Sequence, residues 1–244
     1  MSAPIITTQS VFAQGDTNPY AKVGELAVNV YGDRFRYVLV GVTALVTAEL
    51  IQEPAEDTLF VSMAVPAIVA IGATAITVTN GTTAVTANMF NDGFLTISTS
   101  TGIGQSFRIM SHTTGVSGAS ITYYLSRPLI TALSVTSKVS VRKSPYAGVI
   151  EFPATTQTGG PVGFARIANT AATYGWIQSG GDTPVLFDNA DNTSNGVIGI
   201  HPSLSVAGSV CAAAAADVAP TFLGYSHQVA SVDSTVSMAH IILD

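Results

Sequence analysis

The sequence predicts an all-β protein made of two or more small antiparallel sandwich or barrel units with an extended N-terminal arm. Apolar and polar residues alternate with a period of two over many short segments. Turn residues separate these segments at intervals near the roughly 8–12 residues typical of sandwiches and barrels. The chain is also rich in Thr, Ser, Ala, Val and Gly.

The N-terminal arm is predicted over residues 1–20, which show little periodicity and several turn-forming residues. Its apolar side chains would be poorly placed in water, so we expect them to order on a neighbouring surface. A frayed tail is the alternative. The apolar anchors are Ile5, Ile6, Val11 and Phe12.

A first β unit is expected over 21–63. Alternating residues predict strands over 26–31 and 34–39, and Gly32-Asp33 between them predicts a hairpin turn. Residues 43–51 fit a short helix or a further strand, because they include β-branched side chains.

A second β unit is expected over 64–148, as a small sandwich or barrel. It ends at Ser144-Pro145-Tyr146. The predicted strands are 75–79, 94–99, 106–112, 121–126 and 138–142.

A C-terminal β domain is expected over 149–244. Turns are predicted at Gly159-Gly160-Pro161, Gly180-Gly181-Asp182 and 192–196. The predicted strands are 149–152, 162–167, 174–178, 184–187, 197–200, 205–211, 221–227 and 236–243.

Charge is scarce in this chain. Nine Lys or Arg and fifteen Asp or Glu occur among 244 residues, and the mean hydropathy is +0.43. Soluble domains carry about 25% charged residues. No apolar run reaches the roughly 20 residues of a membrane span, so we expect no membrane partner. The simplest interpretation is a protein that hides much of its surface against copies of itself or a partner.

The charges also argue against nucleic acid as a partner. Residues 1–143 hold eight basic and eight acidic groups, and from residue 144 onward Arg166 alone faces seven acids. Phosphate binding needs a basic face, and neither half provides one. The N-terminus lacks the features of a secretory signal, and Cys211 is the only cysteine, so we expect synthesis in a reducing cytosol.

No motif predicts catalysis or a cofactor. The segment 102–106 (GIGQS) resembles a phosphate loop, but it leads into a predicted strand, so a tight turn with positive φ is the better interpretation. No Gly-x-Ser-x-Gly motif occurs, and Cys211 has no cationic neighbour that would activate it. We therefore expect no enzyme activity, no catalytic residue and no cofactor.

Metal ligation is not expected either. An Asx-rich turn explains one oxygen-rich cluster better than a calcium loop does. That cluster is Asp188, Asp191, Asn192, Asn195 and Gly196. The four histidines lie far apart without metal-ligand spacing, although a folded sheet can bring two of them together. They are His112, His201, His227 and His240.

Trp176 is the only tryptophan. If exposed, it would offer a stacking surface for a sugar. Burial in the core is the preferred interpretation, because one Trp buries so much surface.

Four segments resemble the head decoration or cement proteins of tailed bacteriophages, and together they span most of the chain in order. They are 33–38 (DRFRYV), 82–110 (TTAVTANMFNDGFLTISTSTGIGQSFRIM), 145–149 (PYAGV) and 174–188 (YGWIQSGGDTPVLFD). The resemblance implies β-rich subunits, often homotrimers, that bind where major capsid subunits meet on the capsid surface of the virion. A tail, fibre or head-fibre protein with a glycan- or receptor-binding β module is the alternative.

On this hypothesis residues 1–63 face the major capsid protein, 64–148 project, and the C-terminal domain builds the trimer. A protein that bridges neighbouring capsid subunits needs a large interface that is mostly uncharged at its centre. The expected partner-binding residues are Ile5, Ile6, Val11, Phe12, Tyr20, Phe35 and Tyr37.

Overall fold

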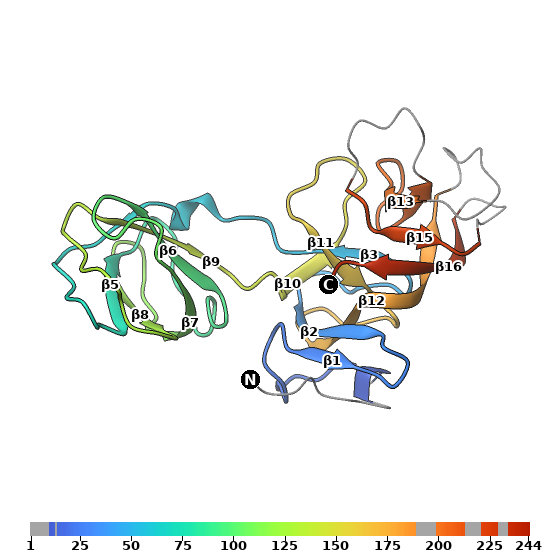
Figure 1. Ribbon diagram of the computed structural model, residues 1–244, viewed down its shortest axis with the longest axis horizontal. Helices are drawn as coiled ribbons and strands as arrows, with labels where there is room; N and C mark the ends of the chain where they lie inside the picture. Colours follow the sequence, from blue (N-terminus) through green and yellow to red (C-terminus); the bar gives the residue numbers. More distant parts are fainter. Residues whose placement is uncertain (1–9, 13, 189–198, 213–220, 229–233) are drawn as a thin grey trace. The chain divides into compact units, whose positions relative to one another are not determined.

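The computed structural model describes residues 10–12, 14–188, 199–212, 221–228 and 234–244 (Figure 1). The chain forms two compact units. One comprises Met1–Ala55 and Pro145–Asp244, and the other comprises Glu56–Ser144. In the described parts of the chain, no helix is long and apolar enough to cross a membrane.

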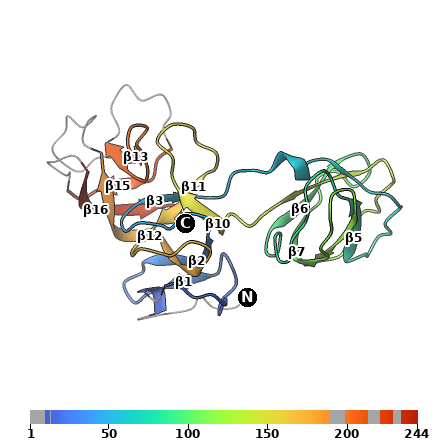
Figure 2. The ribbon, with the colours of Figure 1, turned by 180° about the vertical axis from the view of Figure 1, so that it is seen from behind.

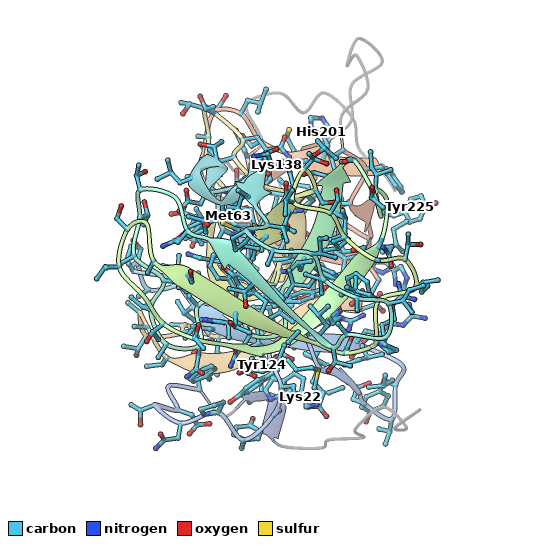
Figure 3. All side chains as sticks on the ribbon, turned by 90° about the vertical axis from the view of Figure 1, so that its left-hand side faces the viewer. Lys22, Met63, Tyr124, Lys138, His201 and Tyr225 are labelled. Carbon is cyan, nitrogen blue, oxygen red and sulfur yellow. The ribbon has the colours of Figure 1, made fainter. Side chains whose placement is uncertain are left out.

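The all-β prediction is confirmed: the described residues form strands and two short 3₁₀ turns, η1 (Ser10–Phe12) and η2 (Thr58–Phe60). The second unit, here called the barrel unit, is a closed barrel with the strand order β4-β5-β8-β7-β6-β9. Its strands are β4 (Met63–Ala64), β5 (Ala75–Thr79), β6 (Phe94–Thr99), β7 (Ser106–His112), β8 (Ser120–Leu125) and β9 (Lys138–Arg142). Figure 2 shows the barrel from behind, and Figure 3 labels Met63 and Lys138 on the two strands that close it.

The barrel unit has its own core, because alternate residues of each strand point inward. On β5, Ile76 and Val78 are buried between more exposed neighbours, and Leu95 and Ile97 repeat the pattern on β6. Phe60 of η2 packs against this core as well. These residues lie in one continuous apolar cluster, so the unit needs no partner to form its interior.

In the first unit, here called the double-ring unit, the described residues form ten strands in one sheet. They are β1 (Leu26–Val28), β2 (Arg34–Val40), β3 (Leu50–Gln52), β10 (Ala147–Glu151), β11 (Pro161–Phe164), β12 (Tyr174–Phe187), β13 (Gly199–Pro202), β14 (Val210–Ala212), β15 (Gly224–Ser226) and β16 (Thr235–Ile242). The pairings close two rings that share β12. One ring is β2-β10-β3-β11-β12, and the other is β12-β14-β13-β15-β16. The pairs β2–β10 and β12–β14 are parallel, which departs from the purely antiparallel prediction.

The shared strand β12 contradicts the turn predicted at Gly180-Gly181-Asp182. Residues 174–180 pair with β2, and residues 180–187 pair with β16. The strand bends at the two glycines instead of ending there. Gly181 has φ +91°, and a Cβ there would lie 2.2 Å from Asp33 Oδ1. Glycine is therefore required at this corner between the two rings.

The domain boundaries also differ from the prediction. Residues 21–55 are not a separate unit, because β2 and β3 pair with β10, β11 and β12. The predicted unit 64–148 corresponds to the barrel unit, which begins at Glu56. Alternation within a strand does not specify its partner, so pairing between distant strands left no local signal.

Candidate functional site

Three of the predicted partner-binding residues belong to the core of their own chain. Val11, Phe35 and Tyr37 are buried and pack with Trp176 in one cluster. The prediction that they contact a partner is wrong, because residues from the N-terminal segment already cover this face of β2. Desolvation by burial raises the pKa of Tyr37 to about 12, so its hydroxyl stays protonated near neutral pH.

Two other predicted contacts remain open to a partner. Phe12 and Tyr20 are exposed, although the Arg166 guanidinium lies over the Phe12 ring at 5.7 Å from its centroid. Ile5 and Ile6 lie outside the described residues. In the described part of the predicted arm, Asp16 forms a bridge with Tyr174, so this part packs on its own double-ring unit.

Trp176 is a core residue, as preferred from the sequence. Its side chain is 2% exposed, and its Nε1 donates to the Tyr20 hydroxyl at 2.7 Å. Its ring meets that of Tyr37 edge-on, with centroids 5.1 Å apart. The indole is therefore not available as a stacking surface for a sugar.

An exposed apolar surface lies at one end of the barrel. In this strand order, the loops β4–β5, β6–β7 and β8–β9 all emerge at the same end. Each carries isoleucine side chains that face solvent: Ile68 (75% exposed), Ile71 (65%), Ile103 (65%) and Ile130 (66%). We call these four residues the isoleucine cap. Large apolar side chains gathered in this way are typical of interaction surfaces.

The three loops are held together by hydrogen bonds. Val69 and Leu133 exchange main-chain bonds of 3.1 and 2.8 Å, which joins the β4–β5 and β8–β9 loops. Gln105 Oε1 accepts from the main-chain N–H groups of Ile130 and Thr131, at 2.8 and 3.2 Å. Gly102 has φ +86° and packs against Leu133 too closely for a Cβ. The segment predicted as a tight turn with positive φ is therefore confirmed as one, and it supports the cap.

The cap is almost free of charge. Residues 65–74 and 100–105 contain no charged side chain, and Arg127 is the only one in 126–137. Its guanidinium donates to Ser106 O at 2.8 Å and lies over the Phe107 ring. A partner could therefore cover the cap without desolvating an unpaired charge.

A hollow of about 380 Å³ lies beside the β1–β2 turn in the double-ring unit. It is lined by Phe12, Tyr31, Asp33 and Arg166 among others. A second hollow of about 260 Å³ shares Tyr31 and Asp33 and includes Asp182. The first hollow combines apolar and aromatic side chains with the polar groups of Asn29, Asp33 and Arg166, a mixture that is typical of small-molecule sites.

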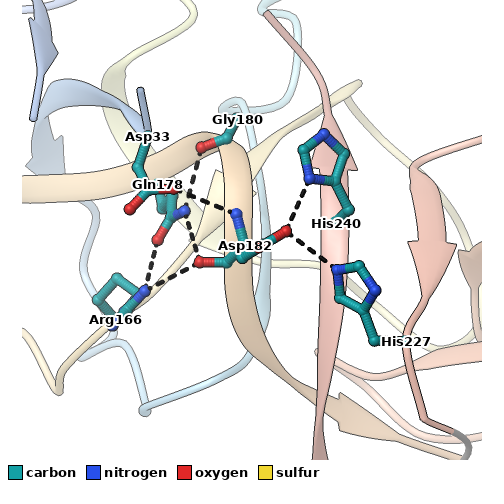
Figure 4. Close-up of polar contacts among 7 residues, drawn as sticks. All are labelled: Asp33, Arg166, Gln178, Gly180, Asp182, His227 and His240. Carbon is teal, nitrogen blue, oxygen red and sulfur yellow. Dashed lines mark hydrogen bonds and ion pairs between the residues drawn. The ribbon is translucent and has the colours of Figure 1, made fainter. Parts of the chain in front are cut away.

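Asp182, His227 and His240 form a cluster that the sequence did not predict (Figure 4). His227 Nε2 and His240 Nδ1 both donate to Asp182 Oδ1, at 3.1 and 2.7 Å. The bond from His227, and then that from His240, holds the pKa of the Asp182 carboxyl below its ordinary value. The fold thus brings together two of the four histidines, with a carboxylate from the corner of β12 as their common partner.

Two further candidate residues, Cys211 and Asp188, are buried. Cys211 is buried with its Sγ 3.4 Å from His201 Nδ1, so the thiol is closed to a substrate. Asp188 is buried and accepts from Ser203 Oγ. The rest of the predicted Asx-rich turn, residues 191–196, falls outside the described residues.

Asp244 joins the end of the described chain to β2 and β12. Arg36 Nε and Nη2 donate to its two carboxylate oxygens at 2.6 and 2.8 Å, and Ser179 Oγ donates as well. Burial acts to raise the pKa of the Asp244 carboxyl. The bonds from Arg36 and Ser179 and the charges of Arg36 and Arg34 outweigh burial and keep this pKa below its ordinary value.

We expect Asp244→Asn to lower the free energy of unfolding by about 1–3 kcal/mol at pH 7, because it removes a bidentate pair with side chains only 16% and 23% exposed. The pKa of the Asp244 carboxyl is lower in the folded state than in the unfolded state, where it is about 3.9. The ionised carboxylate therefore stabilises the fold at pH values above the unfolded-state pKa, and this stabilisation is lost as the pH falls through the folded-state pKa. The difference from wild type should therefore shrink below about pH 4. Urea unfolding across this range measures it, with Glu56→Gln, an exposed charge removal, as the control. A difference independent of pH would contradict the assignment.

Comparison with protein-family models, with curated protein sequences and with solved structures finds no match for this chain.

Proposed function

We propose that this chain is a virion structural protein, a decoration protein that binds the outside of a tailed-phage head and stabilises contacts between major capsid subunits. The observation that carries the proposal is the isoleucine cap: four apolar side chains, each at least 65% exposed, on loops with a single charged residue. Such a surface suits the uncharged centre of a protein interface.

The distribution of charge supports contact through the barrel unit. By sequence, the barrel unit holds five basic and three acidic residues, whereas the double-ring unit holds four basic and twelve acidic ones. Excess negative charge favours solvation and opposes close approach of like surfaces. We therefore assign the cap to the capsid contact and the double-ring unit to the solvent side. This replaces the capsid contact expected of 1–63, since Phe35 and Tyr37 are buried.

A head under pressure from packaged DNA gains stability when many copies of a clamp bridge neighbouring subunits. Binding of this kind needs shape and apolar area, not an active site. We further propose assembly as a homotrimer on the capsid surface after synthesis in the host cytoplasm. The resemblance of four sequence segments to decoration proteins favours this form of the proposal.

The alternative is a tail or fibre protein with a glycan-binding module. It is favoured by the hollow of about 380 Å³, whose lining includes Tyr31, Asp33 and Arg166. Binding there would not involve Trp176, which is buried.

Imaging of the phage particles that carry this chain distinguishes the two proposals. Electron cryomicroscopy, combined with copy numbers from mass spectrometry, should find hundreds of copies on the head. A few copies at the tail would favour the fibre protein. Absence of the chain from purified particles would overturn both proposals.

A further inference from the structure

We propose that Asp182, His227 and His240 bind one divalent transition-metal ion, with Zn²⁺ as the best match, at the corner of β12. Nothing in the proposed capsid contact requires this site. Figure 4 shows the three side chains converging from neighbouring segments of the double-ring unit.

The ligand atoms are already close to the arrangement that an ion needs. One ring nitrogen of His227, one of His240 and a carboxylate oxygen of Asp182 lie within 4.8 Å of one another. With Zn–N and Zn–O distances near 2.0–2.2 Å, two ligand atoms on a tetrahedral ion lie roughly 3.3 Å apart. The observed 3.1 and 2.7 Å from the imidazoles to Asp182 Oδ1 are only slightly shorter. Small movements would admit the ion between them.

The strands position both histidines relative to Asp182. His240 lies on β16 directly opposite Asp182 on β12, and Tyr225 of β15 is the partner of His240 on its other side. His227 follows β15, and its main-chain N–H donates to Met238 O at 2.9 Å. The three ligands thus come from adjacent paired segments, which limits their freedom before an ion arrives.

The main chain of Asp182 is fixed by a separate set of contacts. Its N–H donates to Asp33 Oδ1 at 3.2 Å. Its carbonyl oxygen accepts from Gln178 Nε2 at 3.0 Å and from Arg166 Nη1 at 3.3 Å. Gln178 is completely buried and also accepts from Arg166 Nη1 at 2.7 Å. These contacts leave the Asp182 carboxylate free to face the histidines.

The chemistry of the ligand set selects the ion. Two imidazole nitrogens and one carboxylate oxygen suit Zn²⁺ and related transition metals, whereas Ca²⁺ and Mg²⁺ prefer oxygen ligands alone. Three protein ligands leave a fourth position for water. The side chains of Asp182, His227 and His240 are 55%, 49% and 45% exposed, so an ion reaches them without any opening of the fold.

Titration calorimetry of the full chain, produced without a polyhistidine tag, with ZnCl₂ tests the proposal. We expect one ion per chain, and a loss of affinity of at least about tenfold in each of Asp182→Asn, His227→Ala and His240→Ala. Glu56→Gln is the matched control for charge, because Glu56 is exposed and lies on the barrel unit. It should bind as wild type does, and circular dichroism should show all variants folded.

Histidine NMR signals supply an internal control within the wild-type chain. Zn²⁺ should shift the ring signals of His227 and His240 and leave those of His112 and His201 unchanged. The proposal is overturned if no binding is detected with free Zn²⁺ up to about 1 mM, if all three variants keep wild-type affinity, or if the shifts occur at His112 or His201 instead.

Discussion

Replacing Trp176 by alanine is expected to lower the free energy of unfolding of the double-ring unit by about 3–5 kcal/mol. The change removes a buried indole that packs against Tyr37 and donates to the Tyr20 hydroxyl at 2.7 Å. It therefore combines a cavity with the loss of a hydrogen bond. Because the barrel unit has a separate core, its own unfolding transition should stay where it is.

Urea unfolding followed by circular dichroism measures this effect without depending on the tryptophan signal. Trp176→Phe should cost less than Trp176→Ala, because it keeps an aromatic ring in the cluster. Tyr31→Ala is the control: its side chain is 87% exposed, so the change should stay within about 0.5 kcal/mol. A cost at Trp176 as small as that at Tyr31 would mean an accessible indole, and the sugar-stacking alternative would regain support.

The barrel shows how much of the fold is encoded locally. The predicted strands 75–79, 94–99, 106–112 and 138–142 coincide with β5, β6, β7 and β9. Each strand has one face toward the core and turn residues at both ends, so the alternation of apolar residues and the flanking turn residues are sufficient to identify it. The same signals do not specify the order of the strands. The sequence therefore left a sandwich and a closed barrel as alternatives for this unit.

The double-ring unit shows where local patterns fail. The glycines of β12 have the composition of a turn, but they serve a bend inside a strand that changes partners. Phe35 and Tyr37 alternate with Arg34 and Arg36, which is the pattern of a strand whose apolar face is buried. The two aromatic side chains are buried because a distant segment containing Val11 covers them. The alternation indicates that this face is buried, but neither the segment that covers it nor the change of partner along β12 has a signal within the segment itself.

The cluster of Asp182, His227 and His240 was hidden for the same reason. His240 and Asp182 are 58 residues apart in the chain and become neighbours only through the β12–β16 register. Histidine spacing in sequence identifies sites on one helix or in one loop, but not sites built across a sheet. The sequence is compatible with a folded sheet that joins two histidines, but it does not indicate which two.

The isoleucine cap leads to the second large expected effect. The double variant Ile71→Asp/Ile130→Asp replaces two exposed side chains on loops of the barrel unit. We expect each replacement to change the free energy of unfolding by no more than about 0.5 kcal/mol, as ordinary surface substitutions do. Burying an isoleucine at an interface contributes about 1.5–3 kcal/mol, and each 1.4 kcal/mol is about tenfold in affinity. Loss of both contacts should weaken capsid binding by at least about a hundredfold.

Cosedimentation with phage heads that lack the chain measures this affinity, and thermal unfolding confirms that the variant is folded. Val42→Asp is the matched control, because Val42 is apolar and 93% exposed but lies on the double-ring unit. It should bind heads as wild type does, since the proposed contact lies on the other unit. If the cap variant binds normally while Val42→Asp does not, the capsid contact belongs to the double-ring unit. The argument from charge is then wrong, because the acidic double-ring unit would itself contact the capsid.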